Sequence, residues 1–185
     1  MGKRTMISDV VNNQLNLIVQ KCFLGNRILD RMMSILSIKF VMNKTSNLLH
    51  VLISHAMPLL ADEISDYQDS RNVLTIYLDT PKDDSDYDTP LQLFETFFNF
   101  MEELEQSIDD GIRIAKENND KMTKIFLEKF LLQINNYTAQ AILLCDKAEM
   151  YGNNTMAWMS FDRHIEDFII VKPLPQKNID GENDD

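Results

Sequence analysis

The chain has 185 residues, 44% apolar and 25% charged, which is typical of one globular domain with a sizeable core. Its formal net charge of −11 argues against nucleic acid and anionic lipid as partners, but can attract metal cations. The five glycines, five prolines and two cysteines are too few for a turn-rich β-barrel, a disulfide scaffold or a cysteine zinc site. No apolar run approaches the ~20 residues that span a bilayer, and no signal-peptide pattern follows the N-terminus. We therefore expect a cytoplasmic protein without a membrane partner.

The first half of the chain is predicted to form two helices joined by a short turn. Apolar residues spaced by three and four over residues 7–40 indicate a long amphipathic helix. The segment 43–46 breaks this pattern, and a second helix is predicted over residues 47–71. Pro58 lies inside this second helix and removes one helical hydrogen bond, which predicts a kink there.

A long link over residues 72–89 precedes the third predicted helix. The start of that helix is marked by Thr89 as the N-cap and by Pro90 in the first helical position. Gln92 completes a capping box, in which its side chain reaches back to the backbone of the cap. The apolar pattern continues to about Glu117, so the predicted helix is long.

The remaining chain is predicted to form one more long helix and one short helix. The fourth helix covers residues 120–150 and ends near Gly152, because glycine favours helix termination. An amphipathic segment over residues 155–168 predicts a short fifth helix. We therefore expect one bundle domain over residues 6–170, followed by a disordered acidic tail over residues 171–185.

The lengths of the connections predict the topology. Short turns after the first and third helices make antiparallel hairpins. The link between the second and third helices has about 17 residues and spans up to ~55 Å when extended. A 25-residue helix is ~38 Å long, so this link can run the length of the bundle and make the two helices parallel. The predicted fold class is all-α, a four-helix bundle of two hairpins joined by one long crossover.

Short motifs along the chain carry a resemblance to a known family. They are Asn13-Gln14-Leu15-Asn16-Leu17 in the first helix, Leu49-His50 in the second, Leu93-Phe94 in the third, the turn Ile114–Thr123, Phe126–Leu131 in the fourth helix and Phe161–Glu166 after it. These motifs resemble bacterial ferritins, and the turn and Leu49-His50 also resemble the Dps mini-ferritins. Over roughly residues 10–168 the chain is identified as a diverged member of the ferritin-like superfamily. The resemblance implies a ferritin-like four-helix bundle with a short C-terminal helix, a homo-oligomer, and a role in iron storage or oxidative stress.

Ferritins oxidise iron at carboxylates and a histidine that point into the bundle. The resemblance places apolar residues at the expected ligand positions, namely Ile18, Met57, Leu60, Met101 and Ile134. Apolar side chains cannot ligate Fe(II), so we predict an apolar bundle centre without a ferroxidase centre. Gln133 and Asn136 lie near these positions, and we expect them to form hydrogen bonds to a neighbouring helix. A shift of register in the second helix would restore part of the ligand set, and a metal-free assembly or interaction module is the alternative function.

The remaining candidate metal ligands are in the second helix. They are His50, His55, Asp62, Glu63, Asp66 and Asp69. Residues five apart on a regular α-helix lie ~140° apart, so we expect that the two histidines do not chelate one metal together. Dps proteins use a histidine in this region with carboxylates of a neighbouring subunit. Any iron is therefore predicted at a subunit interface, where imidazole and carboxylate would suit Fe(II) or Zn(II); the alternative is packed histidines and a solvated acidic face.

Self-association is also predicted from an apolar cluster in the third helix. The cluster consists of Phe97, Phe98, Phe100 and Met101. Four large apolar side chains within five positions cover more of a helix surface than the ~100° stripe that one core uses. We therefore expect the protein to self-associate.

Overall fold

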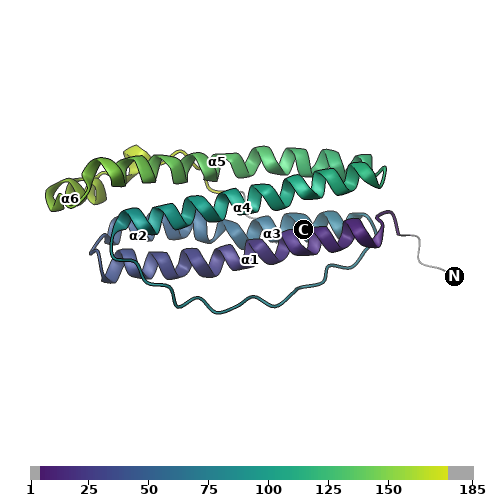
Figure 1. Cartoon of the computed structure of the whole chain (residues 1–185), viewed down its shortest axis with the longest axis horizontal. Coiled ribbons are helices and arrows are strands. Elements are labelled where there is room, and N and C mark those ends of the chain that lie inside the picture. Colours follow the sequence, from purple (N-terminus) through teal and green to yellow (C-terminus); the bar gives the residue numbers. More distant parts are fainter. Residues whose placement is uncertain (1–4, 175–185) are drawn as a thin grey trace, which may run out of the picture.

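The computed structural model describes residues 5–174, and over those residues the chain is helical with no strand (Figure 1). The elements are α1 (Asp9–Ile38), α2 (Asn43–Leu49), the π turn η1 (His50–Ser54), α3 (Ala56–Ser70), α4 (Pro90–Glu117), α5 (Lys121–Tyr151), α6 (Thr155–Arg163) and the 3-10 turn η2 (Ile165–Phe168). Helix α1 packs against α3 and α4, and α4 packs against α5, so two hairpins share one core. The predicted four-helix bundle with a long crossover and a short C-terminal helix is confirmed. Within residues 5–174, no helix is both long and apolar enough to cross a membrane.

Local signals define the ends of α4 and α5. The Thr89 hydroxyl accepts a hydrogen bond from the N–H of Gln92 at 3.2 Å, as expected of an N-cap. The Gln92 side chain reaches back one residue further than predicted, because its Oε1 accepts the N–H of Asp88 at 2.8 Å. Asp120 caps α5, and Gly152 ends it with a φ of +48°, which glycine adopts without strain.

The second helical arm of the bundle, which consists of α2, η1 and α3, is interrupted near Pro58. Because proline has no N–H, the carbonyl of Ser54 four residues earlier has no helical donor. The side chain of Asn26 on α1 replaces that donor, and its Nδ2 donates to the Ser54 carbonyl at 3.1 Å. Upstream of this point the N–H of His55 donates to the carbonyl of His50 at 3.0 Å, an i to i+5 bond. The break predicted at Pro58 thus takes the form of a π turn that ends four residues before the proline.

The crossover over residues 71–89 lies along the outer side of α1 (Figure 1). Amide side chains spaced by four on α1 hold it: Asn12 donates to the Leu74 carbonyl, Asn16 accepts the Ile76 N–H, and Gln20 donates to the Asp79 carbonyl. Further along, Arg31 donates to the Ser85 carbonyl and Lys39 pairs with Asp86. The contacts advance in the same order on both segments, so the crossover runs parallel to α1.

The C-terminal segment folds back onto α5. The Gln140 side chain is fully buried and holds this segment with both of its polar atoms. Its Nε2 donates to the carbonyl of Phe168 at 3.0 Å, and its Oε1 accepts the N–H of Ile170 at 2.7 Å. Val171 is buried against the core, so the described packing continues past the predicted domain end at residue 170. The rest of the predicted tail, residues 175–185, lies outside the described residues.

The apolar cluster of α4 packs inside its own chain. Phe97, Phe100 and Met101 are 2%, 4% and 0% exposed, and Phe98 packs partly buried against the same core. Phe97, Phe100 and Met101 are thus covered by their own chain, so they give no support to the self-association predicted from this cluster. Because α4 packs against both α1 and α5, it buries a wider arc than the single stripe assumed from the sequence.

Candidate functional site

The centre of the bundle is filled at the five positions where the resemblance predicts ferroxidase ligands. Every one of these side chains is 0% exposed: Ile18 from α1, Met57 and Leu60 from α3, Met101 from α4 and Ile134 from α5. All five belong to one continuous hydrophobic core. The prediction that they are buried in an apolar centre is confirmed. None of the five offers an oxygen or nitrogen ligand to a metal ion.

One carboxylate lies at the edge of this core. Burial raises the pKa of Glu63, and a hydrogen bond with the Gln133 side chain partly opposes that shift. The predicted bond from Gln133 to a neighbouring helix is thus confirmed, whereas Asn136 is exposed. Burial, reinforced by the charge of Glu63, also raises the pKa of both Cys22 and Tyr137 to about 12. These two groups therefore stay neutral at physiological pH.

The π turn brings the two histidines of the second arm together. The ring centroids of His50 and His55 are 4.2 Å apart, with the ring planes tilted by 56°. The predicted separation of ~140° holds for an α-helix. It is wrong here, because an i to i+5 hydrogen bond places residues five apart above one another.

A carboxylate from α1 joins the histidine pair. The Oδ1 of Asp30 lies 3.1 Å from the Nε2 of His50. The hydroxyl of Ser54 donates a short hydrogen bond to the same Asp30 oxygen. Asn26, one turn before Asp30 on α1, donates to the Ser54 hydroxyl oxygen at 3.0 Å. The side chains of Asp30 and His50 remain 46% and 41% exposed, so solvent reaches this cluster.

The predicted acidic ligands do not join the histidines within one chain. Asp62, Glu63, Asp66 and Asp69 are exposed on α3, beginning seven residues beyond His55. Among residues 5–174, no group of three or more His, Cys, Asp or Glu side chains is arranged to hold a metal ion. Sequence reasoning missed Asp30, Ser54 and Asn26 as neighbours of His50. Two features of the sequence could have indicated this cluster. Pro58 leaves the Ser54 carbonyl without a helical donor, and the polar residues Asn26 and Asp30 lie one turn apart on α1.

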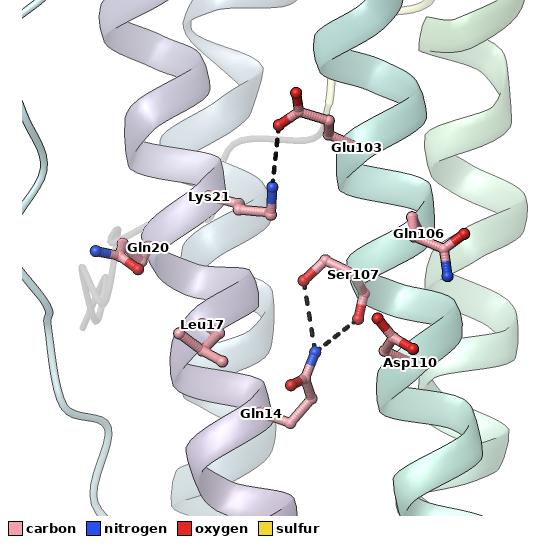
Figure 2. Close-up of a pocket in the computed structure, with 8 residues that line it drawn as sticks. All are labelled: Gln14, Leu17, Gln20, Lys21, Glu103, Gln106, Ser107 and Asp110. Carbon is pink, nitrogen blue, oxygen red and sulfur yellow. Dashed lines mark hydrogen bonds and ion pairs between the residues drawn. The ribbon is translucent and has the colours of Figure 1, made fainter.

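A shallow groove of about 340 Å³ lies between α1 and α4 (Figure 2). It is lined by Gln14, Leu17, Gln20, Lys21, Glu103, Gln106, Ser107 and Asp110. Figure 2 shows two pairs of polar residues that bond across the groove, Gln14 with Ser107 and Lys21 with Glu103. The Gln14 Nε2 donates to the Ser107 carbonyl at 2.8 Å, and the Lys21 Nζ lies 3.3 Å from a Glu103 carboxylate oxygen. The groove is thus a polar contact between two helices.

Solved ferritins have the same arrangement of helices. An open-pore ferritin from the archaeon Archaeoglobus fulgidus matches with a TM-score of 0.81 at 19% identity, over 85% of this chain and 96% of that one. The chain has the ferritin fold. A humanised archaeal ferritin matches this ferritin-like chain with a TM-score of 0.82 at 19% identity, over 91% and 99% of the two chains. A ferritin from Chlorobium tepidum gives a TM-score of 0.76 at 17% identity, over 87% and 98%. No family profile and no curated protein sequence matches the chain.

Proposed function

We propose that this chain is a diverged ferritin-like subunit of the iron-storage and oxidative-stress group, cytoplasmic and homo-oligomeric, whose bundle no longer oxidises iron. The observation that supports the loss of the ferroxidase centre is the filled bundle centre, represented by Met57, Met101 and Ile134. Fe(II) prefers carboxylate oxygen and imidazole ligands. Apolar side chains supply neither, and they occupy the volume that a di-iron centre needs.

Iron oxidation tests this proposal directly. The purified chain is mixed with Fe(II) in air and iron oxidation is followed by absorbance, with an active ferritin as positive control. The chain should oxidise iron no faster than buffer does. Stoichiometric oxidation by the wild-type chain that persists in a His50→Ala/His55→Ala double variant would contradict the loss of the bundle site. The metal content of the purified protein is the second measurement, and bound iron pairs in the bundle would also contradict it.

Self-association is supported by exposed apolar side chains on the crossover. Leu74, Ile76 and Tyr77 are 69%, 53% and 61% exposed on an extended segment held against α1. Two identical extended segments can pair about a twofold axis, where each copy contributes the same surface. A Leu74→Glu/Ile76→Glu variant should sediment as a smaller species than wild type. Leu132→Glu, at an equally exposed position on α5, is the matched control and should not change the sedimentation.

Iron that the assembled protein binds is proposed to lie between two chains. His50 or His55 of one chain would combine with exposed carboxylates of α3 from another, namely Asp62, Glu63, Asp66 or Asp69. Metal would then bind only the assembled form, so iron affinity should rise with protein concentration. Replacing both histidines with alanine should reduce iron uptake by the assembled protein. Unchanged uptake in that variant would contradict this site.

A metal-free assembly or interaction module is the second candidate function. The same filled centre favours it, because none of the five central positions holds a ligand. The two candidates differ in one measurement, which is iron bound by the assembled wild-type chain. Assembly without iron uptake above that of the double-histidine variant would favour the metal-free module.

A further inference from the structure

The histidine pair of the π turn has the spacing of a metal chelate. Two histidines one α-helical turn apart can bind one zinc ion from a single helix face. With Zn–N bonds of ~2.0–2.1 Å in tetrahedral geometry, two coordinating imidazoles have ring centroids roughly 5 Å apart. The rings of His50 and His55 are 4.2 Å apart and tilted by 56°. Both rings therefore lie within reach of one common ion.

The contact between Asp30 and His50 bears on which ring nitrogen is available. The Nε2 of His50 lies 3.1 Å from Asp30 Oδ1, an ion-pair distance, so a proton on that nitrogen would face the carboxylate. The Nδ1 of His50 would then keep its lone pair for a metal. Asp30 is itself held by the short hydrogen bond from the Ser54 hydroxyl. A carboxylate that orients a metal-binding histidine in this way is common in zinc sites.

We propose that His50 and His55 of a single chain bind one late first-row divalent ion of the zinc and copper class, with Asp30 as a positioning residue. Water completes the coordination, because His50 is 41% exposed and solvent reaches the cluster. Imidazole ligands favour these ions over magnesium or calcium. The site needs neither a second chain nor iron chemistry, so it goes beyond the proposed function and does not depend on it.

Zinc binding to the full-length chain tests the assignment. Titration with Zn²⁺ against a chromophoric chelator should give one ion per chain at neutral pH. His50→Ala and His55→Ala should each weaken binding by at least tenfold. His164→Ala is the matched control, because this third histidine is exposed at the end of α6, where its Nδ1 lies 2.9 Å from the Ser160 carbonyl, and should leave affinity unchanged. Equal losses in all three variants, or no loss in His55→Ala, would overturn the proposal.

Asp30 has a separate test. Asp30→Asn should weaken Zn²⁺ binding by about 10–100-fold, as loss of a ligand-orienting partner does. Nitrogen-15 NMR of the zinc-bound wild-type chain should show Nε2 of His50 protonated and Nδ1 bound to metal. Metal on Nε2, or unchanged affinity in Asp30→Asn, would overturn the positioning role.

A third variant separates this site from the site proposed between chains. Replacing Asp62, Glu63, Asp66 and Asp69 with their amides should leave the Zn²⁺ affinity of the diluted chain unchanged. Loss of Zn²⁺ binding in that variant, or binding that appears only at concentrations where the chain assembles, would overturn the single-chain site. Failure of the assembled protein to take up iron would not contradict the single-chain zinc site.

Discussion

The bundle centre and the π turn lie on the same pair of helical arms, yet they have opposite chemistry. At the centre, Ile18 and Met57 are both 0% exposed in one hydrophobic core. At the π turn, α1 contacts the second arm through Asp30 and His50, both nearly half-exposed. Polar groups with metal-binding chemistry are thus found where the backbone departs from the α-helix and water can enter. The interior of the bundle is instead filled by apolar packing.

The largest expected effect comes from placing a carboxylate at the centre. Met101→Glu places an unpaired acid where the wild-type side chain is 0% exposed. The free energy of unfolding should fall by ~3–5 kcal/mol, the cost of an uncompensated buried charge. Met101→Leu conserves volume and polarity, so it is the control and should cost less than ~1.5 kcal/mol. Urea unfolding measures both, and a loss below ~1 kcal/mol for the glutamate would mean that the centre admits water or a cation.

A smaller effect is expected at the π turn. Asn26→Ala removes the side-chain donor to the Ser54 carbonyl, which Pro58 has already deprived of its helical partner. A buried carbonyl left without a donor costs about 1–3 kcal/mol. In a Pro58→Ala background the helical N–H returns, so the same Asn26→Ala change should cost less. A double-mutant cycle with no coupling between the two positions would show that Asn26 does not replace the missing donor.

The smallest effect is expected at the edge of the core, from Glu63→Gln. Burial raises the folded-state pKa of Glu63, so folding favours its protonated form. The Glu63 carboxyl is therefore most favourable to the folded state at pH values below the ordinary pKa of a glutamate. This advantage is lost as the pH rises through the raised folded-state pKa. Glu63→Gln should be relatively more stable near pH 7 than near pH 4. The change should be below about 1 kcal/mol, because the group is partly exposed and screened by solvent. Unfolding free energies at both pH values measure it, and an opposite sign would contradict the burial of this carboxyl.

Features encoded by neighbouring residues were predictable from the sequence. The start of α4 at Thr89 and Pro90 and the end of α5 at Gly152 depend on residues within one turn, and the structure confirms both. The apolar centre was also predictable, because each position needs only its own side chain and a correct register. The candidate metal site was harder to predict from the sequence. Pro58 signals a break, but the donor to the carbonyl that it frees is Asn26, which lies 28 residues before that carbonyl.

The burial of α4 shows a second limit of the same kind. The apolar face of α4 is too wide to be covered by one neighbouring helix. From the sequence alone, the surface that covers the rest could belong to a second copy of the chain or to a second helix of the same chain. Phe97 and Phe100 are buried because α4 lies between α1 and α5. Long-range packing therefore decides what an apolar face covers, whereas local patterns decide only that it must be covered.

The crossover joins the two hairpins covalently, but the shared core does not require that connection. The residues that fill the core come almost entirely from the helices, and the crossover is attached through side-chain amides along the outside of α1. A protease cut within the largely exposed stretch 79–84 would therefore leave two fragments, each an intact helical hairpin, with most of their mutual packing unchanged. Such fragments are expected to remain associated after cleavage and to recombine when expressed separately.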